Sequence, residues 1–600
     1  MSEQPENLTL AADFPPPTRD EWRALVSAVL AKSGVGPDVD PEDALSHTTY
    51  DGIRIRPLYT ADDAPSLDVD GAPGQSPFVR GATADGATTT GWDVRTRPVG
   101  VDAAAVNRAA LQDLETGATS IWLEPGTDAL PVADLGAALA GVYLDLAPIA
   151  LDAGPQTRAA AAELLRLAAE RGVDPAELRG TLGVDPIGGR ARTGADADLT
   201  LLADLRGHGT GLHLATVDAT VYHDAGASDA QELGVGTAVG VAYLRALSDA
   251  GATVDEALAA IEFRWAVTVE QFPSIAKLRA ARRIWARVAE LSGADAGRGQ
   301  YQHAVTSAAM LTRRDPWVNL LRTTIGCFAA AVGGADAITV APFDAAIGVS
   351  DDFARRIARN TQTILHDESS LARVLDAAGG SWFVESLTDR LAERAWDVFT
   401  GIERAGGALA ALDNGRIGEL IAATRAARDA DIAHRRAPIT GVSEFAFVGE
   451  APVERPAGPS APDGLLPRVR YAQDYEALRD RADAAPSRPR IFLATLGPYA
   501  AYSGRAGFAA NLFQAAGLEC VTGTVDEFAA AGTSVACLCS SDKVYAEDAA
   551  GAAEALRAAG ATWLWLAGKV DVPGVDGQVY AGGDALAALR TTVDQLGVQP

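Results

Sequence analysis

Short apolar runs alternate with amphipathic helical patterns between about residues 92 and 400. Each run has the length of a strand, and the segments between runs repeat apolar residues every three or four positions. The runs that we expect to form strands are 94–98, 119–123, 143–148, 180–184, 213–217, 262–268, 303–308 and 337–341. The helical patterns include 102–116, 155–171, 228–250, 273–292, 315–332 and 351–366. Eight strand–helix units in succession predict an α/β fold, a parallel (β/α)8 TIM barrel.

A second region of strand–helix alternation follows a proline-rich segment. Helical patterns continue through about 383–433, and residues 451–468 then carry five prolines. Because proline lacks a backbone donor and fixes φ, this segment is predicted to be an extended linker. Apolar runs resume at 490–496, 518–523, 534–540, 562–568 and 578–582. About 110 residues of this alternation predict one flavodoxin-like, doubly wound domain.

The N-terminal region is predicted to be an arm that ends in a helix. Pro15, Pro16 and Pro17 stop any earlier element, and Thr18 to Glu21 have the pattern of a capping box. An apolar stripe along 18–32 then requires a surface to pack on. The predicted divisions are an arm and helix at 1–50, the barrel at 51–400, a helical and proline-rich linker at 401–488, and the small domain at 489–600.

Composition narrows the class of protein. The 600 residues carry 51 basic and 79 acidic side chains, a net charge of −28. Nucleic acids and anionic membranes attract clustered cations, so neither is an expected partner. The four cysteines, Cys327, Cys520, Cys537 and Cys539, are too few for a disulfide framework. With no secretory signal and no apolar run long enough to span a membrane, the sequence predicts a cytoplasmic protein.

Candidate acid–base groups stand where barrel strands are predicted to end. Glu124, Asp185 and Asp218 have a functional interpretation as mouth carboxylates and a structural one as helix caps. No cation is obviously paired with them, so the structural interpretation is favoured. His223, within Tyr-His-Asp, is either a base or a solvated loop histidine, and the second is favoured.

Two further patterns favour structural roles. Cys537 and Cys539 point to one face of a strand, but no nearby ligand completes a metal site, so buried inert thiols are favoured. The glycines of GVGTAVG, 234–240, half-match a dinucleotide fingerprint. They lie inside a helical pattern and not at a strand-to-helix turn, so they fail that fingerprint's context.

Long and unusual segments in this order carry a family resemblance. They are GIRIRPLYT (52–60), GQSPFVRG (74–81), WDVRTR (92–97), FPSIAKLRAARRIWA (272–286), VSDDFARRIARNTQTILHDES (349–369) and GGSWFVESLTDRLAERAW (379–396). The chain resembles the cobalamin-dependent acyl-CoA mutases, and the methylmalonyl-CoA mutase family most closely. The resemblance implies a barrel for acyl-CoA and adenosylcobalamin held between that barrel and a C-terminal cobalamin domain.

The small domain departs from the pattern of catalytic chains in that family. Their Asp-x-His-x-x-Gly motif supplies the histidine that ligates cobalt, but the aspartate position is Tyr499 here and the histidine position is Ala501. An expected upstream lysine is Thr495. Ser541-Asp542-Lys543 replaces Ser-x-Leu, and Ala567-Gly568 replaces Gly-Gly. Alanine has no donor atom, so the resemblance implies that this domain is a degenerate cobalamin-binding domain.

The barrel departs from the family pattern in parallel. A Tyr-His pair falls on Thr220-Val221, a Gln-Asn-Asp retains only Asp185, and a His-Thr-Asn becomes Thr339-Val340-Ala341. His303 and Ser307 match the family, but a glutamine between them is Val305, and the substrate-facing tyrosine expected within 82–91 is absent. Several polar groups that would bind one substrate are thus lost together in the barrel, in parallel with the losses in the small domain.

Some family members pair a catalytic large chain with a shorter, non-catalytic small chain of the same fold, and this sequence resembles the small chain. The resemblance implies no catalytic, cofactor-binding or metal-binding residue here. The large partner would bind adenosylcobalamin and the acyl-CoA and interconvert methylmalonyl-CoA and succinyl-CoA by radical rearrangement, as in propionyl-CoA metabolism. Two alternatives stay open. One is a free-standing enzyme of other acyl-CoA chemistry, with Asp185 or His223 as base, and the other is an assembly or binding protein for a cobalamin enzyme.

Overall fold

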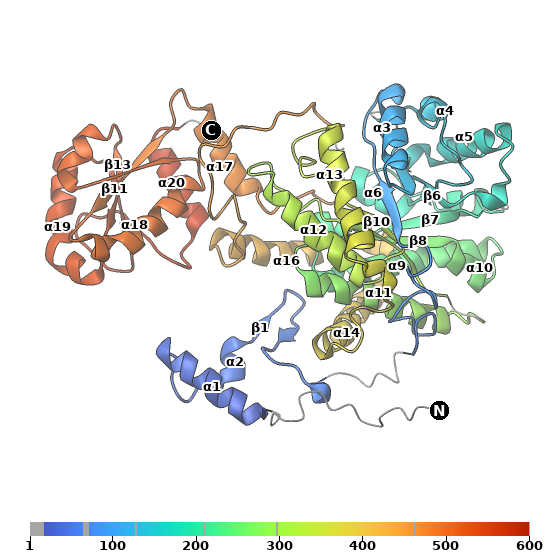
Figure 1. Ribbon diagram of the computed structural model, residues 1–600, viewed down its shortest axis with the longest axis horizontal. Helices are drawn as coiled ribbons and strands as arrows, with labels where there is room; N and C mark the ends of the chain where they lie inside the picture. The colour runs from blue at the N-terminus through green and yellow to red at the C-terminus, as the bar shows by residue number, and fades with distance from the viewer. Residues whose placement is uncertain are drawn as a thin grey trace.

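The computed structural model places a large barrel and a small α/β domain at opposite ends of the molecule (Figure 1). Helices α16 (Arg416–Ala433) and α17 (Gln473–Ala484) lie between them. The structure describes residues 17–63, 71–126, 129–207, 211–295, 298–459 and 463–598. Pro15 and Pro16, predicted to precede the first helix, lie outside the described residues.

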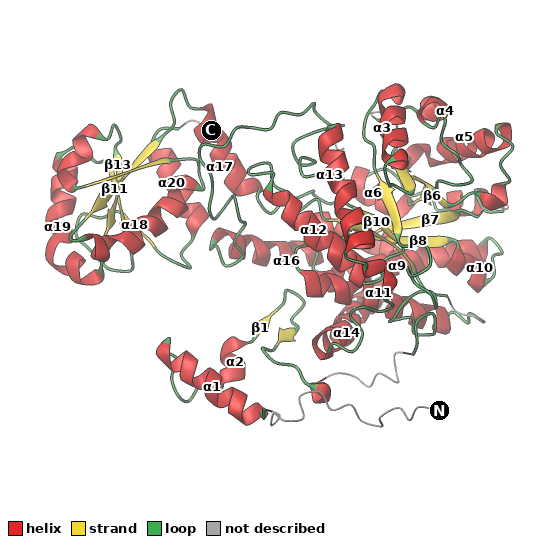
Figure 2. Cartoon of the chain, viewed as in Figure 1, coloured by secondary structure: helices red, strands yellow, loops and turns green. Residues whose placement is uncertain are grey.

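Eight parallel strands close the barrel and confirm the predicted fold class (Figure 2). Around the barrel the order is β10-β3-β4-β5-β6-β7-β8-β9, so each strand lies beside its neighbours in sequence and β10 closes on β3. The strands are β3 (Asp93–Thr96), β4 (Ser120–Leu123), β5 (Ile149–Leu151), β6 (Gly180–Val184), β7 (His213–Asp218), β8 (Ile261–Val267), β9 (Tyr301–Thr306) and β10 (Ala337–Thr339).

The third strand lies further along the chain than the sequence predicts. The expected strand at 143–148 is a turn, in which the amides of Leu146 and Ala147 donate to the carbonyl of Tyr143. Tyr143 and Leu146 are 72% and 74% exposed. β5 begins only after Pro148, whose carbonyl accepts the amide of Ile121 from β4. Apolar content does not distinguish a strand from an apolar turn, and here the pairing with β4 decides the position.

Helices surround the barrel. The longer ones are α3 (Ala103–Glu115), α5 (Thr157–Glu170), α9 (Asp229–Asp249), α11 (Gln271–Leu291), α12 (Val318–Val332), α13 (Asp352–Thr363) and α14 (Trp382–Arg404). The shorter ones are α4 (Leu135–Ala138), α6 (Pro186–Thr193), α7 (Thr200–Asp204), α8 (Thr220–Asp224), α10 (Val254–Ala259) and α15 (Ala408–Asp413).

The glycine-rich run 234–240 is a packing surface of α9. A Cβ at Gly236 would lie 2.8 Å from the Trp265 ring, and one at Gly240 would lie 2.7 Å from the Phe263 ring. These glycines lie in the middle of the helix and allow it to approach the aromatic side chains of β8 closely.

The small domain is a five-stranded parallel sheet with the order β12-β11-β13-β14-β15, as a flavodoxin-like domain requires. Its strands are β11 (Arg490–Thr495), β12 (Glu519–Gly523), β13 (Val535–Cys539), β14 (Trp563–Ala567) and β15 (Gly577–Val579). Its helices are α18 (Tyr499–Gln514), α19 (Asp542–Ala558) and α20 (Ala585–Gln595). In the described parts of the proline-rich segment, 451–459 and 463–468, the chain forms neither helix nor strand.

The N-terminal arm projects from the barrel (Figure 1) and packs on the barrel core through Ile53 and Ile55 near its end. It comprises α1 (Arg19–Lys32), α2 (Pro41–Leu45) and the hairpin of β1 (His47–Thr48) and β2 (Arg54–Ile55). Thr18 and Glu21 form the predicted capping box. No residue of α1 is buried, and Leu25 and Val29 are 70% and 62% exposed. Trp22, Val26 and Leu30 of the apolar stripe are half-buried, whereas Leu25 and Val29 have no covering surface within the described chain.

Buried charges join the barrel shell to its strands. Lys277, on α11, is fully buried and lies 2.7 Å from Glu232 and 2.9 Å from Asp229, both on α9. Glu232 also accepts the backbone amide of Ala266 on β8 at 2.8 Å. Burial opposes the charge on Lys277, but the two carboxylates outweigh it and raise its pKa. One lysine thus holds two helices and a strand together.

Replacing Lys277 by methionine should lower the free energy of unfolding by about 3–5 kcal/mol, because Glu232 would remain buried without its cation. Urea denaturation followed by circular dichroism measures the change. Arg287→Met, on the same helix, is the matched control, since its pair with Glu290 is exposed. It should cost no more than about 1 kcal/mol. Equal losses in the two variants would show that the buried cluster has no special weight.

Candidate functional site

The C-terminal mouth of the barrel holds three aspartates and two arginines. Arg192, on α6, lies 3.1 Å from Asp152 and 3.0 Å from Asp218. Arg264, on β8, contacts the same two carboxylates at 3.1 and 3.0 Å. The expectation that no cation is paired with the mouth carboxylates is therefore wrong. The partners come from other strands and helices, so sequence proximity did not reveal them.

Each mouth carboxylate is committed to the fold. Asp185 caps α6 through the amide of Gly188 and accepts the hydroxyl of Tyr243 at 2.6 Å. Burial raises the pKa of Asp185 to about 6. Burial also opposes the charge on Asp218, but Arg264 and Arg192 outweigh it and hold its pKa below the usual value. These groups balance one another's charges at the site where a barrel enzyme binds its substrate.

Side chains fill the barrel interior below the mouth. The guanidinium groups of Arg264 and Arg97 lie 3.9 and 4.5 Å from the centre of the Trp122 ring. Fully buried His303 meets the same ring edge-on and lies 2.8 Å from the Thr339 hydroxyl. Burial and the nearby arginines lower the pKa of His303, which keeps its ring neutral. Glu124, the third predicted mouth carboxylate, pairs with Arg97.

His223 is buried, so the expectation of a solvated loop histidine is wrong. It lies on α8 with 4% of its surface exposed. Its Nε2 lies 2.7 Å from the Ser307 hydroxyl, and its Nδ1 lies 3.5 Å from Glu232. The residue types are those of a nucleophile, base and carboxylate set. However, Ser307 is only 2% exposed and donates its amide to Val267, and Glu232 already binds Lys277. The geometry is that of a structural network.

The strand ends of the small domain form its expected ligand crevice. Tyr545, on α19, is 2% exposed and accepts the Ser540 amide at 2.7 Å. Its hydroxyl also lies 2.9 and 3.0 Å from the carbonyls of Leu538 and Ala567, which closes the ends of β13 and β14. The Arg505 guanidinium lies over the Tyr545 ring, 5.1 Å from its centre.

The sequence positions that differ from the family motif surround this crevice. Helix α18 begins at Tyr499, which is 73% exposed, so Ala501 lies in its first turn. A Cβ at Gly568 would lie 2.7 Å from Arg505, so this side chain occupies the space beside the glycine. Neither Arg505 nor Tyr545 was identified from the sequence, since only the folded strand ends bring them together.

Three of the four cysteines are buried thiols, and Cys520 is half-buried. Cys537 and Cys539 are fully buried on β13, and burial raises the pKa of Cys537 well above its usual value. Burial likewise raises the pKa of Cys327 and of Cys520 to about 12. Among the described residues no three histidine, cysteine or acidic side chains are grouped to hold a metal ion. No described helix is long and apolar enough to cross a membrane.

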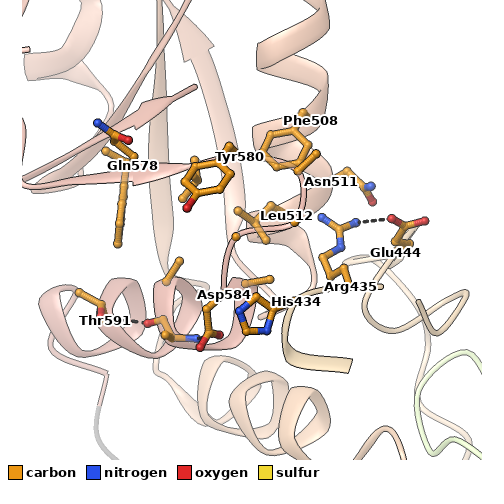
Figure 3. Close-up of a pocket in the computed structure, with 18 residues that line it drawn as sticks. His434, Arg435, Glu444, Phe508, Asn511, Leu512, Gln578, Tyr580, Asp584 and Thr591 are labelled. Carbon is orange, nitrogen blue, oxygen red and sulfur yellow. Dashed lines mark hydrogen bonds and ion pairs between the residues drawn. The ribbon is translucent and has the colours of Figure 1, made fainter. Parts of the chain in front are cut away.

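A pocket of about 430 Å³ lies where the chain after α16 meets α18, β15 and α20 (Figure 3). Its lining includes the side chains of Arg435, Phe508, Leu512 and Tyr580. No residue of the strand-end crevice described above contributes to the lining, so the two sites are distinct.

The raised pKa of Asp185 allows a test of the charged network at the barrel mouth. A carboxyl whose pKa is about 6 in the folded state and about 3.9 in the unfolded state binds more protons when folded. As pH rises through about 6, Asp185 becomes charged in the folded state, and its contribution to the free energy of unfolding falls. Asp185→Asn keeps an acceptor for Gly188 and Tyr243, and its stability relative to wild type should be about 1 kcal/mol greater at pH 8 than at pH 5.5.

Urea denaturation at the two pH values measures this difference. Asp198→Asn is the control, because hydrogen bonds from Thr200 lower the pKa of Asp198 and it stays ionised at both values. A pH-independent effect of Asp185→Asn would mean that Asp185 is ionised throughout this range.

Comparisons with known proteins agree on one family. The family model described as methylmalonyl-CoA mutase matches residues 48–129 and 124–490. A Streptomyces virginiae protein named methylmalonyl-CoA mutase small subunit is 55% identical over 613 residues, which cover 99% of each chain. The protein of that name from Propionibacterium freudenreichii subsp. shermanii is 40% identical over 99% of this chain and 97% of its own.

A relative named methylmalonyl-CoA mutase, without the words small subunit, is less similar. The protein from Escherichia coli K12 is 28% identical over 459 residues, which cover 71% of this chain and 64% of that one. The full-length similarity is therefore to proteins named as small subunits.

Proposed function

Since this chain belongs to the methylmalonyl-CoA mutase family, we propose that it is the small, non-catalytic subunit of a heterodimeric methylmalonyl-CoA mutase. The large subunit binds adenosylcobalamin and the acyl-CoA and interconverts methylmalonyl-CoA and succinyl-CoA, an isomerisation of propionyl-CoA metabolism. The observation that carries the proposal is the 55% identity over 99% of both chains to a protein named as this subunit.

The residues of the small domain do not fit adenosylcobalamin. Ala501 stands where a cobalt-ligating histidine would be required, and its methyl group has no donor atom. Tyr545 and Arg505 occupy the crevice at the strand ends, where each makes contacts within the chain. These contacts would have to break before a corrin could enter. This supports the assignment of the cofactor to the large subunit.

The barrel interior gives similar support for the assignment of the substrate. Trp122 lies beneath Arg264 and Arg97, and His303 packs against the edge of its ring. An eight-stranded barrel is just wide enough for such side chains to fill it. A pantetheine arm along the axis would have to displace these stacked and paired groups.

The exposed stripe of α1 is the proposed contact with the large subunit. Leu25 and Val29 lie one helical turn apart, so they share one face of the helix. Arg19 and Arg23 are both paired with Glu42 of α2, which fixes the orientation of the helix in the arm. An obligate interface buries more than about 2,000 Å², so the arm would add to a larger contact.

Co-expression with a large mutase chain tests the proposal. The two chains should elute together in size-exclusion chromatography, and the corrinoid absorption should accompany the complex but not the isolated small chain. A corrinoid band on the purified, partner-free chain would contradict the cofactor assignment. Elution of the full-length chain alone under gentle conditions would instead favour a free-standing enzyme.

The arm contact has a sharper test in point substitutions. Leu25→Asp with Val29→Asp should weaken co-elution with the large chain, as should deletion of residues 1–32, because charges would enter an apolar contact. Ser27→Asp with Ala31→Asp is the control, since these exposed residues lie on the opposite side of α1. Cooperative urea unfolding of each variant checks its fold. If all variants co-elute equally, the arm is not part of the interface.

Turnover distinguishes the proposal from the alternative of a free-standing enzyme, in which His223 or Asp185 would act as the base. His223→Gln and Asp185→Asn should leave the turnover of the assembled complex within a few-fold of wild type. A general acid or base contributes roughly 10²–10⁴ in rate. A loss of that size in an intact complex would place a second active site in this barrel.

A further inference from the structure

We propose that the pocket between the chain after α16 and the small domain binds a small organic anion with a flat apolar body, and that Arg435 is its anchor. The pocket has a volume of about 430 Å³, within the range of small-molecule sites. Figure 3 shows Arg435 and Glu444 on one side, with Phe508, Leu512 and Tyr580 nearby. The proposal goes beyond the subunit assignment and does not depend on it.

Arg435 is the polar group that requires a ligand. Its side chain is only 9% exposed, and its Nε finds no hydrogen-bond acceptor among the described residues. One terminal nitrogen lies 3.2 Å from Glu444, an ion pair whose geometry does not make a hydrogen bond. Burial lowers the pKa of this arginine. An unpaired buried donor is costly, so an anion that accepts these hydrogen bonds would gain binding energy.

Glu444 does not close the site to an anion. Its side chain is 32% exposed, so it is able to turn toward solvent when a ligand pairs with Arg435. The residue itself is held by its backbone, since its carbonyl accepts the amide of Gly441 at 2.7 Å. The carboxylate thus serves as a displaceable partner, which balances the charge of Arg435 while the pocket contains no ligand.

The start of a helix also opens on the pocket. Helix α20 begins at Ala585, which lines the pocket, and first-turn amides of a helix have no intrahelical carbonyl to bond. Asp584 caps only the amide of Ala587, at 2.9 Å. The Asp584 carboxylate lines the pocket and already neutralises the start of this helix, so Arg435 is the group that favours an anion there.

The other residues that line the pocket favour a ligand with an apolar body. Phe508 and Leu512 lie on α18, four residues apart and so on one face, and Tyr580 follows β15. Trp565 of β14 also lines the pocket, and its indole nitrogen already donates to Thr592 at 3.0 Å. Aromatic rings on several sides favour a flat ligand that stacks or packs edge-on.

A pair of fluorescent probes separates the charge from the apolar body. The probe 8-anilinonaphthalene-1-sulfonate carries an anion on flat rings, and N-phenyl-1-naphthylamine has the same rings without the anion. Titration of the full-length chain with each probe, followed by fluorescence, gives two dissociation constants. Arg435→Met should weaken the sulfonate by about tenfold or more, because hydrogen bonds to a charged group contribute at least that factor. The same variant should leave the uncharged probe within about twofold.

Two further variants keep the test decisive. Arg505→Met removes an arginine of the same domain outside the pocket, and it should leave both probes unchanged. Thr591→Trp places a large ring in the pocket without removing Arg435, and it should block both probes. If the sulfonate binds Arg435→Met as tightly as wild type, or binds Thr591→Trp unchanged, the dye is adventitious and the proposal fails. Circular dichroism of each variant confirms that its fold is intact.

Discussion

The fold of this chain depends on pairing the charges that it buries in and around the barrel. Arg264 and Arg192 share Asp152 and Asp218 at the mouth, and Lys277 binds two carboxylates of α9 in the shell. Leaving one such group without its partner is far more costly than losing an exposed pair. The network therefore constrains where strands and helices sit, and it also occupies the place where a barrel of this kind would receive a substrate.

In the small domain, side chains of the same chain likewise fill the ends of the strands. The ends of β13 and β14 are joined through the Tyr545 hydroxyl, and Arg505 packs on its ring beside Gly568. Both domains thus retain their architecture while contacts within the chain fill the positions at which ligands of this fold bind. In contrast, the exposed apolar residues of α1 have no covering surface within the described chain, and Arg435 has an unused donor beside a pocket. Unpaired donors also remain within the barrel and at the strand-end crevice, on Arg264, Trp122 and Arg505.

Sequence reasoning succeeded where the signal is local or periodic. The capping box at Thr18 to Glu21, the helical run 234–240 and the eight-unit alternation each follow from spacing along the chain. It failed where an apolar run had two possible structures, as at 143–148, and where a polar residue's partner lies far away. His223 lies 84 residues before Ser307, so a reader of the sequence sees only a histidine in a polar tripeptide. Two strands carried a signal of a charged barrel interior, since charges alternate at Arg95 and Arg97 and again at Glu262 and Arg264.

The sequence by itself determined the fold class and the family, because periodicity and residue identity are properties of the chain alone. Tertiary structure decided which charges meet and which spaces remain. Arg192 and Arg264 converge on Asp218 only when three elements close around the mouth, and the space beside Arg435 exists only where the chain after α16 meets the small domain. Pairing and cavities depend on distances across the fold, and spacing along the chain does not encode those distances directly.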